Sequence, residues 1–412
     1  MQGIGAETKW AIFKETVFRQ LRAAEPLKRI ALIEESHELD KGFENPNEIT
    51  GTRTALVKVP MKSQVSGAIN ITGAPENGFA ELLSAACGGY TTIAGAFKRY
   101  FGIGAGTTLT LAGAPVTPNS EEVYVRAVPL PGVYTPWIPL TKSLAPGADE
   151  YDIDNLTGEI TFGDDQTGKQ IFVNWCKVVA GVYSHIIKPA DVPFFGLWST
   201  KGNVDLFEYA GCAVNGASLE SSSEGFLGLS CDLISAKEYI ASIDVTGHSF
   251  PSNLTLSPLS LFKMAQARVF VDYLADARLN KVSWEIANNL DPYWSLNCDD
   301  AISKIYPAVQ ENNLGISVVF DRIDDYAKFK REEFFSVELE YGGCAATGVE
   351  IGATGETYRF YAHFPRFRFE TAPLPVSTGK MMLEGGGMAN LETGMDRAYK
   401  AVIVNGQATL WS

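Results

Sequence analysis

Apolar and polar side chains alternate in several short stretches of the chain, and this alternation predicts β-strands. In residues 335–341 apolar side chains occupy every second position, while Ser336, Glu338 and Glu340 occupy the positions between them. Successive side chains of a strand point to opposite faces, so this strand should have one dry and one solvated face. Residues 281–286 repeat the pattern. The chain is therefore expected to be mainly β.

Two further alternating runs lie within residues 359–370 and are separated at Pro365, where a strand would lose a ladder hydrogen bond. In the second run, Arg366 and Arg368 are interleaved with phenylalanines. Stacked aromatic and basic side chains can bind single-stranded nucleic acid. A strand with a buried aromatic face and a basic outer edge explains the same pattern, and this interpretation is favoured.

One segment has clear helical periodicity. Between Phe79 and Ala86, four apolar residues fall at i, i+3, i+4 and i+7, so they share one helix face. Asn77 is expected to cap the start, and Gly88 with Gly89 to end the helix.

Two other helical segments have local signals only. Ser257 followed by Pro258 has the composition of a helix start, with serine at the N-cap and proline at the first helical position. A short helical turn is also expected over residues 324–329.

The middle of the chain differs in composition. Prolines are frequent from residue 107 onward, and three short alternating runs follow, separated by turns at 155–158 and 164–168. The apolar members of these runs are Tyr151, Ile153, Ile160, Phe162, Ile171, Val173 and Trp175. We expect residues 107–180 to form a small β subdomain. It would be inserted between the two parts, 1–106 and 181–412, of a larger domain.

Composition and charge restrict the function. The 412 residues are 46% hydrophobic and 20% charged, as in globular proteins, with no apolar run long enough for a membrane helix and no signal-peptide pattern at the start. Synthesis in the cytoplasm and no membrane association are therefore expected. The net charge of -14 has the wrong sign for a protein that grips nucleic acid by its phosphates. DNA could still lie next to the protein if it has to move past without binding. Solubility alone explains the negative charge equally well.

The sequence contains several incomplete chemical motifs. Gly163 to Lys169 resembles a phosphate-binding loop, but Gln170 replaces the hydroxyl residue that would hold magnesium. Gly247-His248-Ser249 begins a nucleophile elbow, yet Pro251 stands where its second glycine belongs. The cysteines occur singly rather than in zinc-site pairs, at positions 87, 176, 212, 231, 298 and 344. No catalytic, cofactor-binding or metal-binding residue is predicted.

A hydrolase is retained as one alternative, because pairing of Ser249 with His37, His185 or His363 is compatible with the sequence.

Six segments, taken in their order along the chain, carry short sequence features that are more informative together than singly. They are residues 9–18 (with Phe-Lys-Glu-Thr-Val-Phe), 66–88 (ending Leu-Leu-Ser-Ala-Ala-Cys-Gly), 208–215 (Glu-Tyr-Ala-Gly-Cys-Ala-Val-Asn), 284–289, 318–329 and 361–366. Together they resemble the tail tube proteins of long-tailed, siphophage-like bacteriophages. The block from Tyr151 to Trp175 also resembles a short β unit that recurs in phage tail proteins.

The resemblance implies a β-sandwich or half-barrel with one flanking α-helix and the inserted β subdomain. It implies a structural virion protein, not an enzyme, that uses no cofactor. Hexameric rings would stack into a tube through which DNA is ejected without specific binding. Its partners would be copies of itself and the tape measure, tail terminator and baseplate proteins.

The resemblance also suggests roles for particular residues. Glu338 and Glu340 could line the lumen, or their strand face could point outward. A long loop between early strands joins stacked rings in this family, and its composition here is typical of turns. The corresponding residues are Lys41, Gly42, Asn45, Pro46, Asn47, Gly51 and Arg53.

An ordinary surface loop has the same composition. The alternative function is a β-rich binding or decoration module of a phage or cell surface that uses residues 107–180 and never polymerises.

Overall fold

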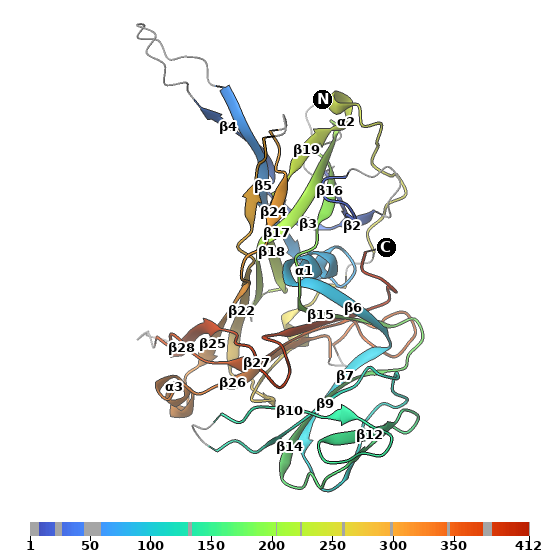
Figure 1. Ribbon diagram of the computed structural model, residues 1–412, viewed down its shortest axis with the longest axis vertical. Coiled ribbons are helices and arrows are strands. Elements are labelled where there is room, and N and C mark those ends of the chain that lie inside the picture. The colour runs from blue at the N-terminus through green and yellow to red at the C-terminus, as the bar shows by residue number, and fades with distance from the viewer. Residues whose placement is uncertain are drawn as a thin grey trace.

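The computed structural model consists mainly of β-strands, as the sequence predicts (Figure 1). It describes residues 8–20, 27–44, 59–130, 134–202, 204–222, 225–257, 260–296, 300–343, 347–373 and 381–411. Two large sheets form the body of the molecule, and two small sheets lie at its lower end in Figure 1.

The largest sheet has 12 strands, with the main path β2-β1-β16-β17-β18-β5-β3 and five strands branching from it. Its strands are β1 (Lys9–Lys14), β2 (Lys28–Ile30), β3 (Leu32–Glu35), β4 (Glu38–Glu44), β5 (Val59–Thr72), β16 (Phe195–Thr200), β17 (Leu206–Ser222), β18 (Gly228–Ser235), β19 (Lys237–Ile240), β22 (Leu279–Ala287), β25 (Glu311–Val319) and β28 (Met382–Met388). The first half of β17 pairs with β16 and β19, and its second half pairs with β18 and β22. One long strand therefore joins the two parts of this sheet.

The second large sheet has seven strands in the order β21-β20-β26-β27-β29-β15-β6. They are β6 (Gly88–Ala94), β15 (Tyr183–Pro189), β20 (Ala267–Val271), β21 (Leu274–Ala275), β26 (Phe335–Tyr341), β27 (Arg359–Phe367) and β29 (Lys400–Asn405). One continuous apolar core fills the space between the two large sheets. A separate hairpin, β23 (Asp291–Tyr293) with β24 (Lys304–Tyr306), lies outside both sheets.

Helix α1 (Phe79–Cys87) lies where the two large sheets meet and contacts β17 and β18 of one sheet and β6 and β15 of the other (Figure 1). All nine of its residues are buried, so it is enclosed rather than flanking. Gly88 ends it as predicted, with φ of 111°. A Cβ at this position would lie 2.0 Å from the carbonyl oxygen of Ala190, so only glycine fits the turn into β6.

The predicted N-cap of α1 is wrong. Gly78 occupies that position, and no side chain caps the helix. The Asn77 side chain instead binds the backbone of Ser257, accepting from its N–H and donating to its carbonyl oxygen at 3.0 and 3.1 Å. A tertiary contact has therefore replaced the local one.

Two small sheets form the insert. One has the order β10-β9-β14-β7 and the other β11-β12-β13-β8. Their strands are β7 (Ala96–Ile103), β8 (Thr108–Thr110), β9 (Glu122–Ala127), β10 (Ile138–Pro139), β11 (Thr141–Lys142), β12 (Glu150–Asp154), β13 (Glu159–Phe162) and β14 (Lys169–Lys177). The seven apolar residues predicted from Tyr151 to Trp175 all lie in the core of this insert. The predicted domain limits, 1–106, 107–180 and 181–412, remain a prediction, although the insert sheets already include β7.

The outcome of the other local predictions varies, because contacts with distant parts of the chain also decide the structure. β27 continues through Pro365, which lies in a register shift opposite Ser336 where the ladder is already interrupted. The helix predicted from Ser257 does not form in the described residues from 260 onward, where a single 3-10 turn covers Met264–Gln266. Helix α3 (Ile323–Lys330) confirms the predicted helical turn. A short helix α2 (Ala241–Asp244) follows β19.

Substitution of Trp284 tests how much the core between the two large sheets contributes to stability. Trp284 is 1% exposed, its ring packs against those of Phe364 and Tyr399 at centroid distances of 5.1 and 4.9 Å, and its Nε1 donates to Asn312. We expect Trp284→Ala to lower the free energy of unfolding by about 3–5 kcal/mol, because it leaves a cavity and an unpaired amide. Urea unfolding of dilute protein measures this loss. Leu156→Ala, at a turn position that is 80% exposed, is the control and should change stability little.

Candidate functional site: assembly surfaces

The hairpin of β4 and the first half of β5 extends away from the body (Figure 1). We call residues 38–44 and 59–64 the arm. Residues of β5 from Val65 onward also pair with β18. Asp40 to Glu44 pair with residues 59–64, while Glu38 and Leu39 at the base of the arm pair with Ser66 and Val65 of the body. Every β4 residue from Glu38 to Gly42 is exposed. At the base of the arm, the Trp294 indole donates to the carbonyl oxygen of Ser63 at 3.3 Å.

The arm overlaps the loop that the sequence assigned to ring stacking. Lys41 and Gly42 belong to strand β4 rather than to a loop. The other predicted residues, Asn45, Pro46, Asn47, Gly51 and Arg53, lie outside the described residues. A two-stranded hairpin outside a larger sheet is only marginally stable in water, so the arm is suited to contact with another chain.

A second surface is the outer face of six neighbouring strands, β5, β18, β17, β22, β25 and β28. Alternate residues of these strands point into the core between the sheets, and the residues between them face outward. We call the outward set the polar face. It comprises Ala68, Asn70, Thr72, Gly216, Ser218, Glu220, Ser222, Gly228, Ser230, Asp232, Lys281, Ser283, Glu285, Ala287, Glu311, Asn313, Gly315, Ser317, Glu384, Gly386 and Met388.

The strand register brings these residues into continuous rows. One row runs Asn70, Ser230, Ser218, Glu285 and Asn313 across five strands. Small side chains dominate, so the surface is smooth.

The polar face also has a marked charge imbalance. Its acidic residues are Asp232, Glu220, Glu285, Glu311 and Glu384, and its basic residue is Lys281, which pairs with Glu220. The sequence already contained this signal as small and polar residues at alternate positions, for example in 281–286. The sequence does not show, however, which of the alternating strands have a face in contact with solvent.

Glu338 and Glu340 do not lie on this surface. Both faces of β26 are buried, and the Glu338 side chain is 0% exposed beneath the insert, 3.0 Å from Arg99. Burial raises the pKa of Glu338 to about 7 against the opposing effect of Arg99. Glu340 is 8% exposed and lies 3.5 Å from Arg359. The prediction of a solvated strand face is therefore wrong, and a lumen role for these two residues loses its basis.

A partly buried ionic cluster joins the insert to the body. Glu122 of β9 lies 2.9 Å from Arg397, 2.8 Å from Lys400 of β29 and 2.9 Å from Lys188 of β15. Burial alone would raise the pKa of Glu122, but the three cations hold it well below the ordinary value. Burial lowers the pKa of Lys400 to about 8.

Nearby, Lys98 and Lys177 of the insert both pair with Glu356 of the body. Cations from both sides therefore fix the insert in place.

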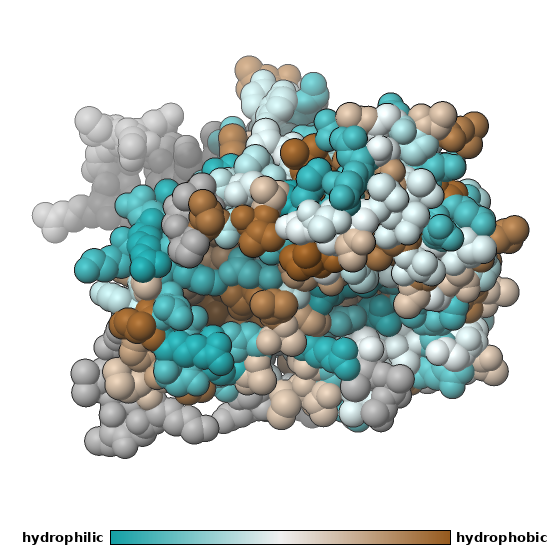
Figure 2. Space-filling model, turned by 90° about the horizontal axis from the view of Figure 1, so that it is seen from below, coloured by the Kyte–Doolittle hydropathy of each residue, from teal (hydrophilic) through white to brown (hydrophobic). Residues whose placement is uncertain are grey.

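Aromatic packing reinforces the same contact. Phe172 of the insert lies 4.9 Å from Tyr273 and 5.1 Å from His363 of the body, measured between ring centroids. The insert is thus fixed to the outer side of the seven-stranded sheet by apolar as well as ionic contacts. On the face seen from the insert end, apolar side chains are scattered among polar ones (Figure 2).

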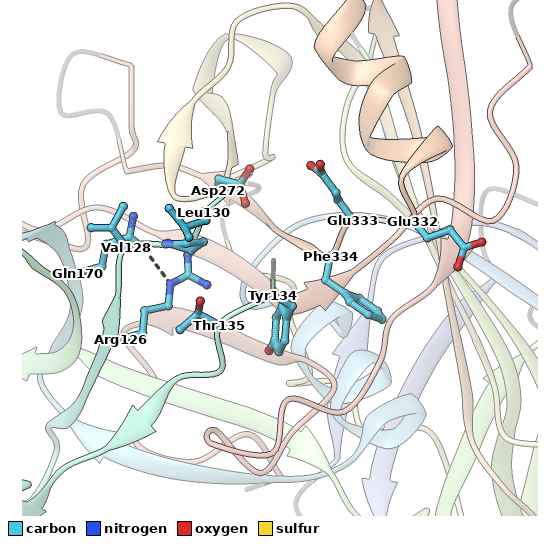
Figure 3. A pocket seen from close by; sticks show the side chains of 11 residues that line it. Arg126, Val128, Leu130, Tyr134, Thr135, Gln170, Asp272, Glu332, Glu333 and Phe334 are labelled. Atoms are coloured by element: carbon cyan, nitrogen blue, oxygen red, sulfur yellow. Dashed lines mark hydrogen bonds between the residues drawn. The ribbon is translucent and has the colours of Figure 1, made fainter. Parts of the chain in front are cut away.

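A cavity of about 460 Å³ opens between insert and body (Figure 3). Its charged groups already have partners: Arg126 donates to Gln170 at 2.7 Å, and Asp272 pairs with Lys328 at 2.6 Å. Arg126 also lies over the ring of Trp137. The residues that line this cavity therefore belong to the contact between the insert and the body.

The hydrolase alternative gains no support from the histidines. Nε2 of His37 contacts the Ser235 hydroxyl, and Nε2 of His363 contacts the Tyr273 hydroxyl. The two ring nitrogens of His185 contact Thr92 and Asn405. Burial lowers the pKa of His37 to about 3 and that of His185 to about 4, so both are neutral core residues. None of these histidine contacts involves Ser249.

Arg366 and Arg368 fit the favoured structural interpretation. Phe364, Phe367 and Phe369 are buried in the core, and both guanidinium groups lie over the ring of Phe334.

Two further observations concern ligands and membranes. In the described part of the chain, no group of three or more His, Cys, Asp and Glu side chains is arranged to hold a metal ion. The helices of that same part are all too short or too polar to span a membrane.

The fold and its exposed arm define a β-rich structural protein. The profile of the phage tail tube protein family matches residues 3–385, nearly the whole length, and the chain belongs to this family. It is therefore a structural component of the phage tail, and the resemblance seen in the sequence is confirmed. No curated protein matches the chain.

The ionic cluster can be tested through Glu122. In Glu122→Gln, Arg397 and Lys400, each with a 1% exposed side chain, lose their shared carboxylate. We expect a loss of about 3 kcal/mol in the free energy of unfolding at pH 7, because an uncompensated buried charge remains. Urea unfolding measures it, and Glu159→Gln on the exposed side of β13 is the matched control.

The same cluster predicts a pH dependence. Because the pKa of Glu122 is depressed in the folded state, the unfolded chain takes up the proton first as the pH falls. The stabilisation is complete at neutral pH and is lost progressively below about pH 4.3, the ordinary value for glutamate. The stability difference between the wild type and Glu122→Gln should therefore shrink on acidification. A difference that stays constant down to pH 2 contradicts the assignment.

Proposed function

We propose that this chain assembles into hexameric rings that stack into the tube of a siphophage-like tail, with the polar face lining the lumen. The polar face is the observation that carries the proposal. It is wide, it is continuous over six strands, and its reverse side is sealed against the core. Strands of neighbouring copies would continue this sheet into one closed barrel, which removes its exposed edges.

The composition of the polar face suits a conduit for DNA. Small side chains give a smooth wall, and carboxylates outnumber ammonium groups. Each phosphate contact would add salt-dependent affinity and slow the passage of DNA, whereas like charges avoid it. Six copies at -14 each give 6 × -14, or -84 formal charges per ring. Repulsion acts over roughly 10 Å at 0.1 M salt, which is enough to keep DNA off the wall.

The position of the arm is an argument for the proposed stacking of rings. The arm extends from the body, and its β4 residues from Glu38 to Gly42 are all exposed and so accessible to the next ring. Tape measure, tail terminator and baseplate proteins would meet the tube inside and at its ends, after synthesis in the host cytoplasm. DNA would pass through without specific binding.

Negative-stain electron microscopy of the purified protein over a range of concentrations tests assembly. We expect rings with a central hole, and stacked tubes as the concentration rises. Single copies or trimers at every concentration would sink the proposal and favour the alternative, a binding or decoration module that does not polymerise.

Charge reversal tests the lumen wall. In Asp232→Lys/Glu285→Lys, two exposed acids of the polar face become cations. We expect tubes of this variant to retain a short DNA duplex on sedimentation, and to release it at high salt. Wild-type tubes should retain none. Glu159→Lys, at an exposed position of the insert, is the control, and equal retention by both variants contradicts a special role for the polar face.

A further inference from the structure

A groove lies at the end of the 12-stranded sheet that is farthest from the arm. It encloses about 390 Å³ between the end of β17, the start of β22 and strand β20. Ala267, Val269, Leu279 and Val282 give it apolar walls. Its charged lining residues are Arg268, Lys281, which pairs with Glu220, and Asp276, which pairs with Arg278. Met264 on its lining is 47% exposed. Exposed apolar side chains beside cationic groups are features of a docking surface.

The register places this groove and the arm at opposite ends of the same strands. β5 has 14 residues and begins in the arm at Val59. Its last residue, Thr72, pairs with Gly228, which in turn pairs with Glu220 beside the groove residues Ser221 and Ser222. At about 3.3 Å per residue, the strand spans roughly 45 Å. A shift along the strands therefore carries the arm of one copy to the groove of another.

The arm and the groove are complementary in charge and polarity. On β4, Glu38 and Asp40 point to one face, and Leu39, 36% exposed, points to the other together with Lys41. The groove offers exposed Arg268 to the acids and apolar walls to the leucine.

Their backbones are complementary as well. β21 pairs with β20 only at Phe270 and Val271, so the edge at Ala267 and Arg268 is open to the groove among the described strands. β4 pairs with β5 along one edge, and its other edge is open in the same part of the chain. Two open edges can join by strand addition.

We propose that the arm of one copy docks in this groove of a copy in the adjacent ring, and that Glu38 and Asp40 meet Arg268 there. The inference rests on the proposed function and names the surface that receives the arm. It makes stacking a head-to-tail contact, which repeats without closing and so builds a filament.

Disulfide trapping tests the contact directly. Leu39→Cys/Met264→Cys places one thiol on the arm and one in the groove, and both positions are exposed. Oxidation of assembled tubes should give a ladder of cross-linked chains on a denaturing gel, because each copy links to the next ring. Leu39→Cys/Leu156→Cys, with its second thiol on an exposed turn of the insert, should give none. Tubes that stack normally without the ladder would falsify the docking site while leaving the tube function intact. A failure to form rings at all counts against the proposed function instead.

Charge exchange provides an independent test. Arg268→Glu should raise the concentration needed for rings to stack by about tenfold or more, because a modest loss per pair is repeated around each ring. Glu38→Lys/Asp40→Lys should do the same, and the combined variant should recover stacking. Arg268→Gln, which adds no new acid beside Glu340, separates loss of the contact from local repulsion. Lys14→Glu, exposed on β1, is the control. Unchanged stacking in both single-side variants overturns the proposal.

Discussion

The packing of both large sheets around helix α1 is the constraint on which the rest of the structure depends. The helix has no solvent-facing side, and even its Glu81 is fully buried and paired with Lys28. Since α1 contacts both sheets, it fixes which face of each sheet is dry. The residues of the polar face meet solvent because the alternate residues of the same strands are buried in this core. A polar, small-residue surface this wide is stable only when a dense core seals it from behind.

The insert changes the chemistry of the second sheet. Without it, β26 would be a strand with one wet face, as its alternation predicts. With it, Glu338 and Lys400 lie in the interior and need opposite charges from Arg99 and Glu122. Buried ions tolerate little displacement, because separation leaves a charge uncompensated. The insert is therefore a fixed part of the protomer rather than a module on a flexible tether.

The surfaces proposed for assembly follow from the same arrangement. Because β5 belongs to the polar face and runs on into the arm, the groove and the arm keep a constant spacing along this strand. A hairpin of two strands has little stability of its own, and the body contacts the arm at its base, where Trp294 and Asp300 bind the backbone of Ser63. In the proposed assembly, docking of the arm on a second copy would link the ordering of the arm to stacking.

The sequence by itself determined the elements whose signals are local. The alternation from Tyr151 to Trp175, the apolar positions from Phe79 to Ala86 and the turn at Gly88 all appear as predicted, because periodicity and backbone sterics act over a few residues. The tertiary structure decided which polar residues meet water. Glu338 and Glu285 have the same alternating pattern, yet one lies beneath the insert and the other on the polar face. Burial depends on what packs against a strand from distant parts of the chain, and alternation carries no information about that.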